Sequence, residues 1–87
     1  MGITVTNNSS NKIEVAINKW GNDGDTSFFS IGKEKKETWD RSDSRGFVLS
    51  LKRSGTQKPY YVQADSLIAV GNTDVKDGDR IIDPISS

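Results

Sequence analysis

The side chains best suited to bind a ligand are concentrated in one short polar segment, T-W-D-R-S-D-S-R-G, at residues 38 to 46. The arginines can donate paired hydrogen bonds, the aspartates can accept them, and the tryptophan ring can stack on an apolar surface. This combination is typical of sugar sites, because a sugar presents an apolar ring face and a rim of hydroxyl groups. The segment could instead be a corner that its own ion pairs stabilise. The predicted binding residues here are Trp39, Asp40, Arg41, Asp43 and Arg45.

Two further aromatic residues, Trp20 and Tyr60, complete the predicted binding set. Packing in the core is the competing interpretation for every aromatic side chain. For Trp39 and for one of the two tyrosines, the binding and core interpretations are equally supported. For Phe28 or Phe29, and for Phe47, a core position is favoured because a phenyl ring has no polar edge to hydrogen-bond.

The composition excludes most kinds of catalysis. The chain has no His and no Cys, so it lacks the residues of Ser-His-Asp and Cys-His sites and of ordinary zinc sites. Paired carboxylates such as Asp40 and Asp43 could hydrolyse a glycoside only at a set separation across a cleft. The chain carries 12 acidic residues, so such pairs are inevitable. We therefore predict a protein that is not an enzyme and needs no cofactor.

Two acidic stretches have the oxygen ligands that calcium prefers. They are N-D-G-D at residues 22 to 25 and D-V-K-D-G-D-R-I-I-D at residues 74 to 83. Neither has the complete spacing of an EF-hand loop. Asp-Gly is also the commonest signature of a tight hairpin turn. The sequence therefore favours turns over metal sites in both places.

Length and charge limit the remaining possibilities. The chain has 87 residues, 32% of them apolar, and no Cys. We predict a single domain over residues 1–87, near the lower limit of size for independent folding. Homo-oligomerisation could bury additional apolar surface. Twelve basic and twelve acidic residues cancel, which argues against a nucleic-acid partner. No apolar run approaches the roughly 20 residues of a transmembrane helix, and no signal peptide or targeting segment is visible. We predict a cytoplasmic protein, or one secreted without a signal peptide.

The elements that would position these residues are predicted to be strands. Phe47, Leu49 and Leu51 alternate with polar or smaller residues, which indicates a half-buried and central strand. Residues 3–6 and 13–17 alternate on either side of N-N-S-S-N and predict a hairpin. Further short strands are expected at residues 26–31, 38–41, 60–64, 67–70 and 80–82. The pattern predicts an all-β, compact antiparallel β-sandwich or small barrel of about six to eight short strands.

Several short motifs occur in order over the first 53 residues or so: the opening I-T-V-T-N-N-S-S, Trp20-Gly21, Gly24-Asp25, Ile31 and the Arg41 to Ser44 turn. With these motifs the segment resembles the aegerolysins, small β-sandwich proteins common in fungi. Aegerolysins are longer, and Asp40 stands where their turn has Gly. The resemblance implies recognition of sphingolipid-containing membranes and recruitment of a larger pore-forming partner.

The residues and the resemblance together give two main hypotheses. The first is a non-catalytic, lectin-like, carbohydrate-binding module of the fungal defence type, and it is slightly favoured because the aromatic residues lie among carboxylates. The alternative is an aegerolysin-like protein that binds a sphingolipid headgroup or membrane, with Trp20 and Trp39 at the interface. A structural or inhibitory protein that pairs through an exposed sheet edge is a third, less specific possibility.

Overall fold

A computed structural model describes residues 2–18, 26–53 and 55–85. These residues form nine strands and no helix, so no helix here could span a membrane. The strands are β1 (Gly2–Asn7), β2 (Ile13–Ile17), β3 (Phe29–Ile31), β4 (Lys36–Asp40), β5 (Phe47–Arg53), β6 (Thr56–Val62), β7 (Leu67–Val70), β8 (Val75–Asp77) and β9 (Arg80–Ile81).

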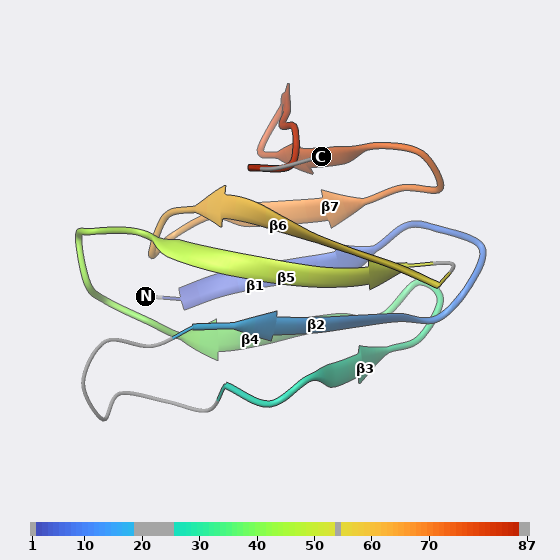
Figure 1. The fold of residues 1–87 in the computed structure, drawn as a ribbon, viewed down its shortest axis with the longest axis horizontal. Coiled ribbons are helices and arrows are strands. Elements are labelled where there is room, and N and C mark those ends of the chain that lie inside the picture. The colour runs from blue at the N-terminus through green and yellow to red at the C-terminus, as the bar shows by residue number, and fades with distance from the viewer. Residues whose placement is uncertain (1, 19–25, 54, 86–87) are drawn as a thin grey trace.

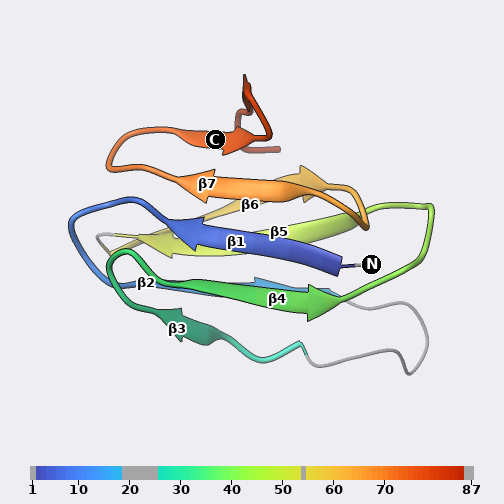
Figure 2. The same cartoon turned by 180° about the vertical axis from the view of Figure 1, so that it is seen from behind.

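The strands form two sheets that pack face to face. Sheet A has the order β4-β1-β7-β8-β9, and sheet B has the order β3-β2-β5-β6. Sheet B lies in front in Figure 1 and sheet A lies in front in Figure 2. The predicted all-β sandwich is therefore confirmed. Strands β1 and β7 pair in parallel, whereas the other strand pairs are antiparallel.

The period-two pattern of β5 produces the burial that the sequence predicts. Phe47, Leu49 and Leu51 are buried between the sheets, whereas Val48 and Lys52 are exposed. Strand β5 lies between β2 and β6, so its predicted central position in the sheet is confirmed. The inward side chains of β1, β2 and β7 complete one continuous apolar core.

The predicted hairpin between residues 3–6 and 13–17 is wrong. Strand β1 belongs to sheet A and β2 belongs to sheet B, so the connection at residues 8–12 crosses from one sheet to the other. The buried Asn7 amide stabilises this crossing: Nδ2 donates to the carbonyls of Asn11 (2.8 Å) and Ile31 (2.9 Å), and Oδ1 accepts from the Ser9 backbone N–H (2.9 Å) and hydroxyl (2.5 Å). Hydrogen bonds to this side chain replace the ladder of a hairpin.

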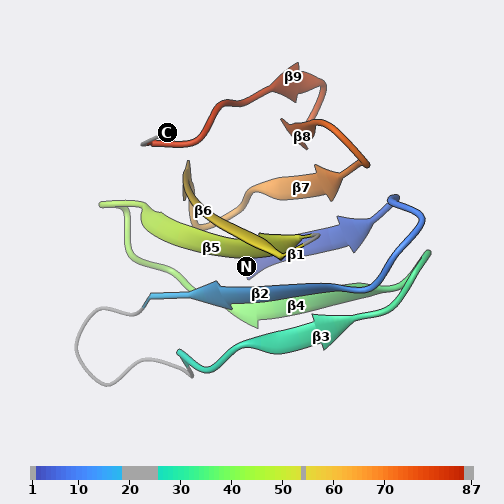
Figure 3. The ribbon, with the colours of Figure 1, turned by 45° about the vertical axis from the view of Figure 1, so that its right-hand side comes forward.

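Two other segments differ from the sequence-based expectation. Residues 52 to 59 are outside the strands expected from the sequence, but the β5–β6 hairpin pairs Arg53 with Thr56, and Gly55 adopts a positive φ of 79°. Pro59 lies on β6, an edge strand, where a missing N–H is tolerated. Strand β8 was not expected, although the Gly78 turn after it was. Figure 3 shows β8 and β9 extending sheet A beyond β7.

Candidate functional site

Two of the three predicted aromatic binding residues, Trp39 and Tyr60, lie in the core. Trp39 is 5% exposed and Tyr60 is 3% exposed. The inward side of β4 carries Trp39, whose ring meets the Phe29 ring edge-on at 5.8 Å between centroids. Neither Trp39 nor Tyr60 presents a ring face to solvent, which argues against direct stacking on a ligand. Trp20 lies outside the described residues.

Arg41 is also buried, at 2% exposure, and its guanidinium connects two strand ends. Its Nη2 donates to the Ile17 carbonyl (3.1 Å), Nε to the Asn18 carbonyl (3.0 Å) and Nη1 to the Asp40 carbonyl (3.1 Å). These bonds tie the end of β4 in sheet A to the end of β2 in sheet B. Arg41 therefore has a structural role, which is to join the two sheets at this end of the sandwich.

The rest of the predicted cluster lies at a corner of the surface, where Asp43 and Arg45 form an ion pair. Arg45 Nη2 lies 2.7 Å from Asp43 Oδ2, and the Arg45 backbone N–H donates to Asp43 Oδ1 at 2.8 Å. The hydrogen bond from the Arg45 side chain is the largest of the effects that lower the pKa of Asp43 to about 2. Asp40 is exposed at the end of β4. The sequence left two interpretations of residues 38 to 46, a ligand site or a corner that its own ion pairs stabilise. The ion pair between Asp43 and Arg45 fits the second interpretation.

A different group of residues forms a groove on the outer face of sheet B. One part of it is a hollow of about 270 Å³. Ala16 and Ser50 are Cα partners on β2 and β5, and their small side chains form its floor. Phe28, just before β3, is 37% exposed beside this floor. The hollow is lined by Ala16, Ile17, Asn18, Thr26, Phe28, Val48, Ser50 and Gln57.

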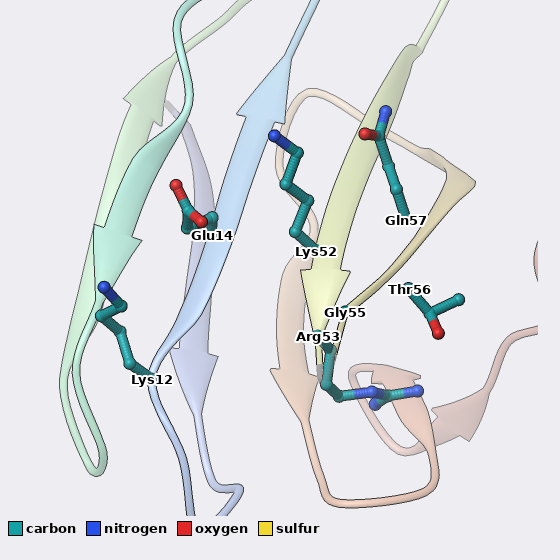
Figure 4. A pocket seen from close by; sticks show the side chains of 7 residues that line it. All are labelled: Lys12, Glu14, Lys52, Arg53, Gly55, Thr56 and Gln57. Carbon is teal, nitrogen blue, oxygen red and sulfur yellow. The ribbon is translucent and has the colours of Figure 1, made fainter.

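The second part of the groove is a polar hollow of about 300 Å³ at the β5–β6 hairpin (Figure 4). It is lined by Lys12, Glu14, Lys52, Arg53, Gly55, Thr56 and Gln57. Glu14 and Lys52 are Cα partners on neighbouring strands, and their side chains point to the same side of the sheet. Gln57 lines both hollows, so we treat them together as the sheet B groove.

Lys52 connects the two parts of the sheet B groove. Its Nζ lies 4.1 Å from the centre of the Phe28 ring, a cation–π contact. Among residues 2–18, 26–53 and 55–85, the only carboxylate within 4.0 Å of a cationic side chain is that of Asp43, beside Arg45. The Lys52 ammonium therefore contacts an aromatic ring rather than the neighbouring Glu14.

The outer face of sheet A offers a less differentiated surface. Its hollow, of about 440 Å³, has no aromatic side chain among the described residues that line it, which are Thr4, Thr6, Asn8, Lys36, Leu67, Ile68, Ala69, Gly78 and Asp79. Leu67 and Ile81 are exposed, at 63% and 60%.

Within the described part of the chain, no three acidic side chains come together as a possible cation site. Residues 22 to 25, the first of the acidic stretches, lie outside it.

Comparison with protein-family models, with curated proteins and with solved structures gives no match to this chain. The resemblance to aegerolysins therefore rests on the sequence motifs alone.

Sequence reasoning missed the sheet B groove, although a signal for it was present. Either Phe28 or Phe29 was expected in the core, and because two neighbours on a strand face opposite sides, the other ring would lie on the outer face. Phe29 pairs with the inward Val15 and still remains 39% exposed at the sheet edge. Lys52 has the outward parity of Val48 and Ser50 on β5. What the sequence could not supply is the register that places Lys52 opposite Glu14.

Proposed function

We propose that this protein is a non-catalytic glycan-binding module and that the sheet B groove is its binding site. The observation that carries the proposal is the exposed Phe28 ring beside a hollow whose floor is made of small residues and whose rim is polar. A sugar ring packs its C–H face on an aromatic ring and directs its hydroxyl groups to the sides. The side chains of Ser50, Gln57 and Thr26 line the hollow where those hydroxyls would lie.

The groove is shallow, which suits a binding module. A catalytic site usually lies in a concave pocket that surrounds its substrate, whereas both hollows here are open to solvent. One such site gives weak affinity. We therefore propose that the protein functions as a homo-oligomer whose repeated sites act together, because linked weak sites gain avidity. A mass of 9.6 kDa by light scattering at micromolar concentration would contradict this part of the proposal.

The experiment is a glycan array probed with labelled protein, followed by titration of the best oligosaccharide. The variants Phe28→Leu and Phe29→Leu form a matched pair, because the two rings are almost equally exposed, at 37% and 39%. Phe28 lines the groove, whereas Phe29 packs against Trp39 on the other face. We expect Phe28→Leu to weaken binding at least fivefold and Phe29→Leu to leave it within twofold. Equal effects of the two variants would refute the site.

The resemblance to aegerolysins implies lipid binding as the alternative. A second arm of the same experiment distinguishes lipid binding from glycan binding. The protein is sedimented with sphingomyelin-containing vesicles in the presence and absence of excess free oligosaccharide. Binding to the vesicles that free sugar does not reduce, together with a blank array, would replace the glycan proposal with the lipid one.

A further inference from the structure

We infer that the glycan bound in the sheet B groove is acidic, with a sulfate or carboxylate group that contacts Lys52 and Lys12. This inference rests on the proposed function and adds the chemical class of the ligand. It is carried by the charges around the polar hollow and by the position of the Lys52 ammonium on the Phe28 ring.

The charge balance of the polar hollow differs from that of the whole chain. The chain has 12 basic and 12 acidic residues, but among the described residues this hollow is lined by three cationic side chains, Lys12, Lys52 and Arg53, and by one carboxylate, that of Glu14. Arg53 is held in place, because its Nη1 donates to the carbonyls of Gly71 (2.8 Å) and Asp74 (3.2 Å). It therefore supplies a fixed positive charge at the end of the hollow.

The two lysines are better placed to contact a ligand. Lys12 and Lys52 are both exposed, and they flank Glu14 on the same side of the sheet (Figure 4). Within the described parts of the chain, neither ammonium has a carboxylate within 4.0 Å. An anionic group in this hollow would meet two ammonium groups that have no carboxylate of the described residues at contact distance.

The contact between Lys52 and Phe28 explains why a neutral sugar would bind less well. Lys52 lies on β5 and Phe28 just before β3, with β2 between the two strands, and the Lys52 ammonium covers one side of the Phe28 ring. A sugar that stacks on this side must displace the ammonium. An exposed cation–π contact is weak, equivalent to about a two- to fivefold change in an equilibrium constant. A neutral sugar gives the displaced ammonium no new partner, whereas an acidic sugar supplies one.

Phe28 and Lys52 would therefore act together on a single ligand. The sugar ring would take the place of the ammonium on the aromatic ring, and the ammonium would turn towards the sulfate or carboxylate. Charge-assisted hydrogen bonds of this kind are stronger than those between neutral groups. Because both partners are exposed to solvent, salt would weaken the interaction.

The test compares oligosaccharides of similar size and different charge. Wild-type protein is titrated with heparin-derived hexasaccharide, hyaluronan hexasaccharide and maltohexaose as sulfated, carboxylated and neutral probes. We expect the better acidic probe to bind at least tenfold more tightly than maltohexaose. Its affinity should fall by roughly three- to tenfold between 50 and 200 mM salt. Equal affinity for acidic and neutral probes would overturn the inference while leaving glycan binding intact.

Substitutions then locate the effect. Lys52→Met should weaken binding of the better acidic probe about tenfold, and it should leave the affinity for maltohexaose unchanged or raise it two- to fivefold, because the Phe28 ring is uncovered. Glu14→Gln should strengthen binding of the acidic probe by two- to fivefold. Lys36→Met and Lys76→Met, on the outer face of sheet A, are the matched controls and should have no effect.

Lys52 is exposed, so Lys52→Met is expected to fold, and thermal melting verifies this. An unchanged charge preference in folded Lys52→Met would overturn the inference. So would binding to phosphatidylserine vesicles in the absence of binding to either acidic hexasaccharide. If neither these probes nor a broad glycan array gave binding to folded protein, the proposed function itself would fail.

Discussion

Replacing Arg41 with Met should cause a large loss of stability without a specific loss of binding. The guanidinium is 2% exposed and donates to three backbone carbonyls, and its bond to the Ile17 carbonyl is fully buried. A hydrogen bond from a charged donor contributes about 1.5–3 kcal/mol. The Asn18 and Asp40 carbonyls are partly buried and can regain water, and removal of the charge also removes its desolvation cost. The net loss in the free energy of unfolding should be about 2–4 kcal/mol.

That loss is large for a domain of this size. A typical 87-residue protein has a free energy of unfolding of about 4–13 kcal/mol, and the variant should melt roughly 10–30 °C lower. Urea denaturation followed by tryptophan fluorescence measures the change directly. Arg80→Met, at an exposed position on β9, is the control and should leave the midpoint unchanged. A loss below about 1 kcal/mol for Arg41→Met, or a loss of glycan binding at unchanged stability, would refute the structural role of Arg41.

Three further predictions concern the crossing between the sheets and the corner before β5. Asn7→Asp keeps the shape of a buried side chain but turns its two N–H donors into acceptors facing two carbonyls, so it should cost about 2–4 kcal/mol in a denaturant titration. The pKa of Asp43, about 2 in the folded protein, should rise towards 3.8 in Arg45→Ala by NMR titration. The contact with Arg45 lowers the pKa of Asp43 in the folded protein. The stability that this contact supplies is therefore present above about pH 4 and is lost as the pH falls towards 2. Gly46→Ala should lower the unfolding free energy by about 1–2 kcal/mol, because φ is +84° and an added Cβ meets the Tyr61 hydroxyl.

The fold class could be predicted because apolar residues that face inward alternate with other residues that face outward along the strands of a sandwich. Strand β5 shows this most clearly, since its inward residues are large and apolar and its outward residues are not. The connection after β1 could not be predicted in the same way. A run of Asn and Ser is compatible with a hairpin and with a crossing between sheets, and the buried contacts of Asn7 decide between them. These contacts include Ile31, which is distant in the sequence.

The candidate site was harder to predict because residue type does not reveal orientation. Trp39 and Arg41 have side chains typical of binding sites, yet both are buried and hold the two sheets together. The parity of β4 places Trp39 inward, but neighbouring polar residues hid this pattern. The sheet B groove brings together residues that are more than thirty positions apart, such as Glu14 and Lys52. Only the strand order and register place them side by side.

The most direct test of the central claim is an NMR titration of ¹⁵N-labelled protein with the oligosaccharide that binds best. We expect the largest shift changes on the outer face of sheet B, at Phe28, Ser50, Lys52 and Gln57, with the control positions Lys36 and Lys76 unaffected. Shift changes confined to the corner at Asp40, Asp43 and Arg45 would contradict the account and restore the site expected from the sequence.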